Sequence, residues 1–164
     1  MSNNDINNPK DMQIVTPEVR PIPGAEMMLG ESPIWDECTA GLYWIDIADP
    51  SVARLHEQKV ERWSLPAQPG ALALCTDGTL LVAMRTGFAL LDPTTGEISL
   101  CGPRVPYDPG HMRFNDGRVD RHGNFWVGSI DERPGGTGAH LFMLDRRGHL
   151  HARLSGGLTI CTCF

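Results

Sequence analysis

Chain-breaking residues recur along this sequence at intervals too short for helices. The 164 residues include 18 glycines and 13 prolines, and no window of eleven residues has the i, i+3, i+4 apolar spacing of an amphipathic helix. Short apolar runs rich in aromatic and β-branched residues lie between the breakers, at 42–45, 80–83 and 125–127. Runs of this length and composition are typical of strands. The sequence therefore predicts an all-β protein.

The segments between these runs have the composition of tight turns. Gly78 and Gly123 stand where a hairpin requires positive φ, and the segment 92–96 begins with Asp-Pro and ends with Gly. We expect strands near 42–47, 52–55, 60–64, 70–75, 79–84, 87–92, 97–100, 118–120, 124–130, 140–145 and 149–154.

One order of elements occurs three times. Each copy has an apolar residue, an Asp or Thr, a turn with a Gly and then an apolar strand, and the copies span 34–47, 72–84 and 118–130. A second pair of short strands follows each copy, within 52–63, 88–100 and 140–154. Four strands in roughly 40–45 residues is the period of a β-propeller blade. About three blades are therefore predicted, with an irregular β-sandwich as the alternative.

The expected domain organisation follows from this repeat. We expect a polar, Asn-rich tail without regular structure over 1–16, a partial propeller over 17–160 and an atypical C-terminal tail over 161–164. Three blades do not close a ring, since characterised propellers have about four to eight. The chain is therefore expected to be truncated. Open edges and apolar strands such as 141–144 predict self-association.

Composition argues against several classes of partner. The chain has 14 Lys and Arg against 20 Asp and Glu, a formal net charge of −6, which is unlike a nucleic-acid-binding surface. No apolar run approaches the ~20 residues of a membrane helix, and residues 1–20 lack the apolar core of a signal peptide. We expect no membrane partner and a cytoplasmic location. Five scattered cysteines do not suggest a disulfide framework.

Several motifs resemble one family. Gly-Glu-Ser-Pro-Ile-Trp at 30–35 is followed by Leu-Tyr-Trp-Ile-Asp at 42–46. Arg-Phe-Asn-Asp-Gly-Arg-Val-Asp at 113–120 is followed by Asn-Phe-Trp-Val-Gly at 124–128. In order and spacing, residues 24–160 resemble the SMP-30/gluconolactonase family, which also includes regucalcin.

This resemblance implies a six-bladed propeller that holds one divalent cation (Ca, Zn, Mg or Mn) in its channel and hydrolyses sugar lactones to aldonic acids. Glu31 matches the family's metal-binding Glu. The family's metal-binding Asn corresponds to the position after Ile160, where Cys161 stands, and its third ligand, an Asp, falls beyond the C-terminus, as does the Asp expected for proton transfer. Arg113 and Asn115 match the family's substrate-binding Arg and Asn.

The residue types agree with these roles. The Glu31 carboxylate is a hard oxygen ligand suited to a divalent cation; its alternative role is that of an exposed loop residue. The Arg113 guanidinium suits a substrate oxygen, with a surface salt bridge as the alternative. Asn115 suits a hydroxyl or a bound water, with a turn-forming role as the alternative. No catalytic residue is assigned within the chain.

Neighbouring residues are expected to play lesser parts. Asp116 is expected to bond local backbone amides, and Glu132 is a weaker candidate for the site. Arg133 stands where regucalcin has Glu, which bears on the choice of substrate. His149 and His151 share a strand face without a third ligand nearby, so we expect solvated histidines. The four tryptophans are expected in the core.

The leading interpretation is metal-dependent hydrolysis of a small-molecule sugar lactone, impaired in this chain because one of three metal ligands is present. A regucalcin-like calcium-binding or regulatory protein without catalysis is the alternative. A non-functional truncation product is the third possibility. The identity of the lactone stays open, since related aldonolactones differ by a hydroxyl or a carbon.

Overall fold

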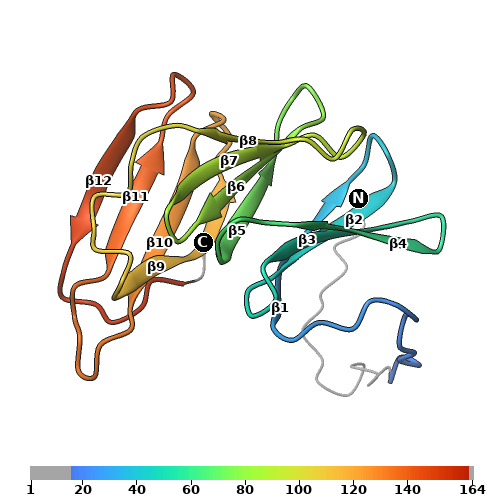
Figure 1. Ribbon diagram of the computed structural model, residues 1–164, viewed down its shortest axis with the longest axis horizontal. Helices are drawn as coiled ribbons and strands as arrows, with labels where there is room; N and C mark the ends of the chain where they lie inside the picture. Colours follow the sequence, from blue (N-terminus) through green and yellow to red (C-terminus); the bar gives the residue numbers. More distant parts are fainter. Residues whose placement is uncertain (1–15, 163–164) are drawn as a thin grey trace, which may run out of the picture.

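The computed structural model describes residues 16–162, and this part of the chain contains only β-structure (Figure 1). It forms twelve strands in three sheets of four, and each sheet is an antiparallel meander of strands consecutive in sequence. The predicted all-β architecture with about three blades is thereby confirmed. Within residues 16–162 there is no helix that could cross a membrane. The predicted N-terminal tail, apart from Thr16, lies outside the described residues.

The blades follow one another along the chain. Blade one contains β1 (Gly30–Asp36), β2 (Gly41–Asp46), β3 (Ser51–His56) and β4 (Lys59–Ser64). Blade two contains β5 (Pro69–Leu74), β6 (Leu80–Met84), β7 (Gly87–Leu91) and β8 (Ile98–Cys101). Blade three contains β9 (Met112–Val119), β10 (Phe125–Asp131), β11 (His140–Leu144) and β12 (Leu150–Ser155).

The expected strand ranges agree with the structure except at the first strands of blades one and three. No strand was expected at β1, and β9 begins at Met112 instead of at residue 118. Pro33 lies within β1, and the Asn-Asp-Gly sequence, for which a turn was the alternative, lies within β9. Both strands accommodate these residues because their pairing is irregular, with register shifts after Glu31 in β1 and opposite 127–129 in β9.

The first strand of each blade is the innermost one. β5 lies beside β1 on one side and β9 on the other (Figure 1). The approach to β9 is so close that a Cβ atom added to Gly70 would lie 2.2 Å from the carbonyl oxygen of Phe114. A glycine is therefore required at this point of the middle blade.

Two clusters of buried side chains join neighbouring blades. The cluster between blades one and two includes Tyr43, Ile45, Leu72 and Val82. The cluster between blades two and three is aromatic, with Phe88, Phe114, Phe125 and Phe142; the Phe88 and Phe114 ring centroids are 5.0 Å apart. Blade two is thus covered on both faces, whereas blades one and three each bury one face against it.

Aspartates close the hairpins at one end of the blades. Asp77 accepts hydrogen bonds from Thr79, and Asp120 accepts them from Asn124 and from the Trp126 indole. Hydrogen bonds from the Asn124 and Trp126 side chains hold the pKa of Asp120 well below its ordinary value. These turns match the prediction from the Asp and Gly spacing.

The tryptophans do not all lie in the core. Trp44 is buried and Trp63 packs against the first cluster. Trp35, however, is 56% exposed. The expectation for Trp35 was wrong because its side chain lies on the face of blade one that is turned away from blade two.

Candidate functional site

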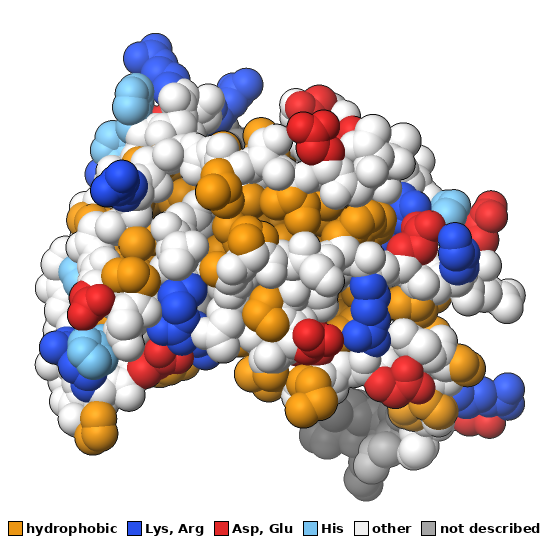
Figure 2. All heavy atoms as spheres, viewed as in Figure 1, with side chains coloured by type: hydrophobic (Ala, Val, Ile, Leu, Met, Phe, Trp, Pro, Cys, Tyr) orange, Lys and Arg blue, Asp and Glu red, His pale blue; other side chains and the backbone are white. Residues whose placement is uncertain are grey.

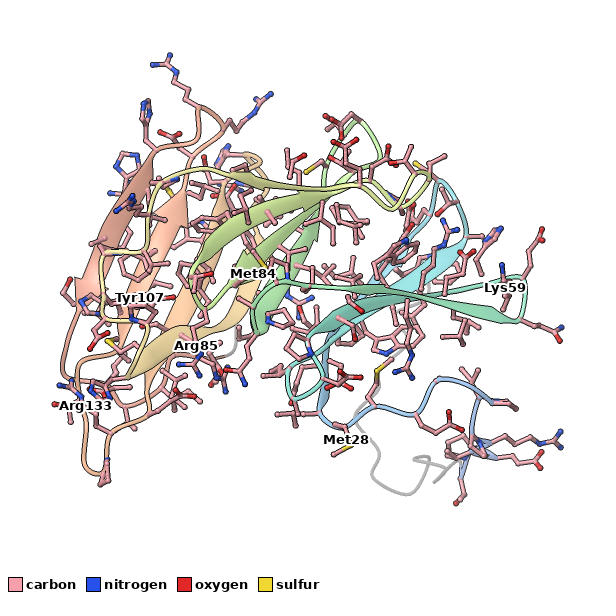
Figure 3. All side chains as sticks on the ribbon, in the orientation of Figure 1. Met28, Lys59, Met84, Arg85, Tyr107 and Arg133 are labelled. Atoms are coloured by element: carbon pink, nitrogen blue, oxygen red, sulfur yellow. The ribbon has the colours of Figure 1, made fainter. Side chains whose placement is uncertain are left out.

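Glu31 and Arg113 occupy equivalent positions in two blades. Glu31 is paired with the residue before Asp46 in β2, and Arg113 is paired with the residue before Asp131 in β10. Both aspartates are buried at the ends of their strands. The propeller repeat therefore places the predicted metal ligand and the predicted substrate-binding arginine at the same end of their blades. Met28, Arg85 and Arg133 all lie toward this end (Figure 3).

Asp46 fixes the chain around Glu31. Its carboxylate accepts hydrogen bonds from the backbone N–H groups of Met28 (2.7 Å) and Leu29 (3.1 Å), just before β1, and from Ala48 and Asp49 (3.0 Å each). Burial alone would raise the pKa of Asp46, but these backbone donors outweigh it and leave the pKa lowered. An ionised carboxylate thus holds the entry to β1 in place.

Glu31 itself is exposed. Its carboxylate makes no hydrogen bond or ion pair with any residue in the described part of the chain, and therefore none with Arg113 or Asn115. It borders a cavity of about 330 Å³ that is also lined by Ala25, Met27, Gly30, Pro33 and Trp44. Ser32, the next residue, has a φ of 54°, which belongs to the left-handed region and marks the irregularity of β1. Convergence of Glu31 with Arg113 and Asn115 on one shared site stays a prediction.

The described residues do not assemble a metal site around Glu31. Residues 16–162 contain no group of three or more His, Cys, Asp or Glu side chains placed to hold one cation. Calcium takes six to eight oxygen ligands and structural zinc takes four ligands. Glu31 alone therefore does not fit a resident cation.

Glu132 lies at the centre of an ion-pair network near Arg113. Its carboxylate accepts hydrogen bonds from Arg85 Nη2 (3.0 and 2.8 Å) and from Arg113 Nε (3.1 Å). Arg85 also donates to the side chain of Gln68 (2.8 Å) and the carbonyl of Pro109 (2.9 Å). The Arg113 side chain is 12% exposed, so this network fixes its guanidinium at the edge of the core.

Sequence reasoning underrated Glu132 and missed Arg85. Arg85 follows the last residue of β6, and Glu132 follows the last residue of β10. Extending the three aligned copies of the repeat by one or two residues would have shown charged side chains at equivalent places in two neighbouring blades.

Arg113 also holds Asn115. Its Nη1 donates to the carbonyl of Phe114 (3.1 Å) and to Oδ1 of Asn115 (3.3 Å). The Asn115 amide approaches the carbonyl of Cys161 at 3.4 Å. Asp116 accepts a hydrogen bond from the N–H of Gly117 (2.8 Å), as expected for a residue that bonds local backbone. Arg113 and Asn115, which the sequence motif singled out, are thus joined by a hydrogen bond into one unit, and their binding of substrate stays a prediction.

The segment after blade three returns to this unit. Asp131 donates its N–H to Thr159 (2.9 Å), and Cys161 donates its N–H to Ser129 (3.0 Å). A Cβ atom on Gly128 would lie 2.6 Å from the Cys161 carbonyl oxygen, so the glycine makes room for this strand-like pairing. Burial, reinforced by the nearby Asp116 charge, raises the pKa of the Cys161 thiol. Positions 163–164 of the predicted atypical tail lie outside the described residues.

Arg133 closes the end of blade three. Its guanidinium donates to the buried Asp131 carboxylate at 2.8 and 2.6 Å, and this hydrogen bonding holds the pKa of Asp131 well below its ordinary value. Arg133 also borders a cavity of about 280 Å³ together with Tyr107, His111 and His140. Burial raises the pKa of Tyr107, which keeps its hydroxyl protonated.

His149 and His151 both contact one carboxylate. Asp145 Oδ2 lies 3.3 Å from His149 Nδ1 and 3.0 Å from His151 Nε2. Both imidazoles are partly exposed. They hold the hairpin between β11 and β12 and belong to no metal site among the described residues.

Comparison with known proteins places this geometry in a family. The sequence model of the SMP-30/Gluconolactonase/LRE-like region matches residues 29–162. A 6-deoxy-6-sulfogluconolactonase of Pseudomonas putida is 36% identical over 120 residues, which cover 72% of this chain and 41% of that protein. A regucalcin of Xenopus laevis is 34% identical over 106 residues, which cover 63% of this chain and 35% of that protein.

Solved structures agree with the fold. A calcium-binding protein, regucalcin, from Agrobacterium tumefaciens superposes with a TM-score of 0.72 and 26% identity, over 79% of this chain and 44% of that one. A gluconolactonase from Xanthomonas campestris has a TM-score of 0.61 at 20% identity, over 79% of this chain and 48% of that one. The chain thus spans less than half the length of these relatives, and it belongs to the SMP-30/gluconolactonase/LRE-like family.

Proposed function

We propose that this chain takes part in the hydrolysis of a sugar lactone, with Arg113 and Asn115 binding the lactone. The observation that carries this proposal is the fixed Arg113–Asn115 unit at the channel end of β9, in a chain 36% identical to a sulfogluconolactonase. Relatives of this family with lactonase names support the same reaction class.

The free donors of the unit suit a polyhydroxylated ligand. Arg113 uses Nε on Glu132 and Nη1 on Phe114 and Asn115. Its Nη2 has no hydrogen-bond partner among residues 16–162 and is proposed to donate to a lactone or hydroxyl oxygen. Glu132 pairs with Arg113 and fixes the plane of its guanidinium, while the sharing of this carboxylate with Arg85 leaves the cluster with a net positive charge. Rigid donors of this kind orient a substrate at little entropic cost.

Glu31 is proposed as one protein ligand of a divalent cation (Ca, Zn, Mg or Mn). Such a cation supplies Lewis-acid chemistry to lactone hydrolysis when it is bound. Because one carboxylate among neutral neighbours binds divalent cations weakly, we propose that the 164-residue chain by itself hydrolyses lactones slowly.

Binding of a hydrolysis-resistant analogue tests the lactone site apart from turnover. Gluconolactam is titrated into the chain by calorimetry or NMR, and we expect saturable binding that Arg113→Met weakens about tenfold or more. Arg104→Met, at an exposed arginine outside the site, is the matched control. Equal binding by wild type and Arg113→Met, with both variants folded, would contradict the proposal.

Turnover is measured separately, with aldonolactones and each of the four cations. We expect rates near background. Rates of about 1–10³ per second in the 164-residue chain would support lactone hydrolysis and contradict the proposed impairment.

Calcium binding without catalysis is the second candidate. It is favoured by the similarity to the structure described as a calcium-binding regucalcin, at 26% identity. Calcium binding that depends on Glu31, without any binding of gluconolactam, would support this candidate against the lactonase.

A further inference from the structure

Two guanidinium groups share one carboxylate beside the Arg113–Asn115 unit. Oε1 of Glu132 accepts hydrogen bonds from Arg85 Nη2 (3.0 Å) and from Arg113 Nε (3.1 Å), and Oε2 accepts another from Arg85 Nη2 (2.8 Å). Arginine keeps its positive charge at any ordinary pH. Two positive charges therefore meet one negative charge, and the Arg85–Glu132–Arg113 cluster has an excess of one positive charge.

The aspartate next to this cluster is already matched by another arginine. Asp131, the residue before Glu132, is buried, and its carboxylate accepts hydrogen bonds from Arg133 Nε (2.8 Å), from Arg133 Nη2 (2.6 Å) and from the N–H of Gly138 (2.9 Å). The ion pairs that Arg85 and Arg113 make within residues 16–162 are both with Glu132. Asp131 therefore does not balance the excess charge of the cluster.

Partial burial strengthens the effect of this charge. The side chains of Arg113 and Arg85 are 12% and 21% exposed, and charges are screened less by water and salt when they are partly buried. Other Lys, Arg and His side chains collect at the opposite end of blade three, around the β11–β12 turn (Figure 2), where Arg146 and Arg147 are exposed. Of these two basic regions, the cluster at Arg113 acts more strongly on a bound ligand.

The two arginines of the cluster differ in what they can offer a ligand. Arg85 donates through Nε to Gln68, through Nη1 to two backbone carbonyls and through Nη2 to Glu132. Its donors are thus occupied, and it contributes charge. Nη2 of Arg113 has no hydrogen-bond partner among residues 16–162. A ligand oxygen at the cluster therefore meets Arg113, and Arg85 lies behind it.

We propose that the lactone bound at this site carries an ionised acidic group on its carbon chain. This inference rests on the proposed function and names the class of lactone that the site selects. An oxygen of the acidic group accepts a hydrogen bond from Nη2 of Arg113, and the negative charge of the acid balances the excess charge of the cluster. Hydrogen bonds between charged groups are roughly twice as strong as those between neutral groups, so a neutral lactone binds less tightly.

Two lactams that differ in one group test this inference. Gluconolactam is neutral, whereas glucarolactam has a carboxylate in place of the terminal hydroxymethyl group. Calorimetry is carried out at low salt and with EDTA, so that a cation held by Glu31 cannot bind the carboxylate. We expect wild type to bind glucarolactam about tenfold or more tighter than gluconolactam. At about 0.5 M NaCl this ratio of affinities should fall at least threefold, because salt screens the charge.

Variants of Arg85 separate its charge from its structural contacts. Arg85→Gln removes the charge, and Arg85→Lys keeps it. Structural damage lowers the affinity for both lactams and leaves their ratio unchanged, whereas loss of charge lowers the affinity for glucarolactam alone. We expect the ratio to fall about fivefold or more in Arg85→Gln and to stay within about twofold of wild type in Arg85→Lys. Circular dichroism shows whether each variant is folded, and the wild-type measurements do not depend on the variants.

The outcomes distinguish this inference from the proposed function. Equal affinity of wild type for the two lactams, or tighter binding of gluconolactam, would overturn the acidic class of lactone and leave the lactone site in place. Binding of neither lactam would overturn the proposed function and this inference with it. An unchanged ratio in folded Arg85→Gln would overturn the assignment of the selectivity to the Arg85–Glu132–Arg113 cluster.

Discussion

Glu31 and Arg113 stand at equivalent places in blades one and three, yet their surroundings differ completely. Glu31 is exposed and has no polar partner within residues 16–162. Arg113 is nearly buried, and within the same residues its guanidinium donates hydrogen bonds to Glu132, Asn115 and the Phe114 carbonyl. The repeat thus determines where a side chain stands, whereas the neighbouring loops determine its chemistry.

The difference predicts how much each of the two residues contributes to the stability of the fold. Glu132 and the Phe114 carbonyl already orient the Arg113 guanidinium, and the carboxylate that Arg113 shares with Arg85 leaves this cluster with a net positive charge. Glu31 keeps its carboxylate solvated at the edge of a cavity and gains neutralisation only from an added cation. Stability measurements should therefore depend strongly on the first region and hardly at all on the second.

The largest expected loss of stability comes from a substitution in β5, the inner strand between β1 and β9. Gly70→Ala would bring a Cβ atom within 2.2 Å of the Phe114 carbonyl oxygen, which forces β5 and β9 apart. We expect a loss of about 3 kcal/mol or more in the free energy of unfolding, measured with urea. Gly41→Ala is the control, since the atoms nearest to its added Cβ belong to the side chains of Thr39 and Arg54, at 3.2 Å or more. Equal stability of both variants would refute the tight contact.

Glu132→Gln tests whether the ion-pair network around Arg113 stabilises the fold. It leaves the guanidinium groups of Arg85 and Arg113 without their shared carboxylate. Because Glu132 is about one-third exposed, we expect a loss of about 1–2 kcal/mol in urea unfolding. A loss below about 0.5 kcal/mol would mean that the network does not hold Arg113, and the contrast with Glu31 would disappear.

Acid should remove the stabilisation that the equivalent aspartates of blades one and three provide, and salt should distinguish between them. Their pKa values are lowered in the folded chain, so their stabilisation is present above an unfolded-state pKa of about 4 and is lost as the pH falls below it. Asp131 relies on the charge of Arg133, whereas Asp46 relies on backbone N–H donors. We expect Asp131→Asn to reduce the acid dependence of unfolding, and also its salt dependence, since salt screens a half-exposed pair. Salt should leave the contribution of Asp46 unchanged; equal salt sensitivity would count against this distinction.

Glu31→Gln should have the smallest effect. With no partner to lose, the variant should unfold within about 0.5 kcal/mol of wild type. Calcium, magnesium, manganese or zinc at millimolar concentration should raise the melting temperature of wild type only slightly, and that rise should be absent in the variant. A larger destabilisation by Glu31→Gln would reveal a structural role that its exposed position does not suggest.

Much of the fold was predictable from local chemistry. Gly78, Gly123 and the aspartates beside them determine the hairpins, because turn geometry depends on a few residues that are close in sequence. The strands Gly41–Asp46 and Phe125–Asp131 were expected within one residue, since their apolar runs end at clear breakers. β1 was not expected, and its Pro33 is accommodated because β1 is an edge strand whose pairing is irregular at this point.

The site was predictable in part. Arg113 and Asn115 were singled out through a contiguous motif, and the structure shows them hydrogen-bonded to one another within β9; their role in binding stays a prediction. The role of Arg85 was not predictable, since its partner Glu132 lies in another blade and only the packing of blade two against blade three brings them together. Interactions across blades leave no local pattern in the sequence.

The meander order of the strands has a kinetic consequence. Every strand within a sheet pairs only with a neighbour in sequence, so a nascent chain can complete each four-stranded unit soon after its last residue emerges. All-β proteins usually fold slowly because distant segments must find one another first. Here the only distant segments that must meet are in different blades, as when β5 of blade two packs against β9 of blade three. Refolding should therefore show early hairpin formation followed by a slower, aromatic-dependent assembly step.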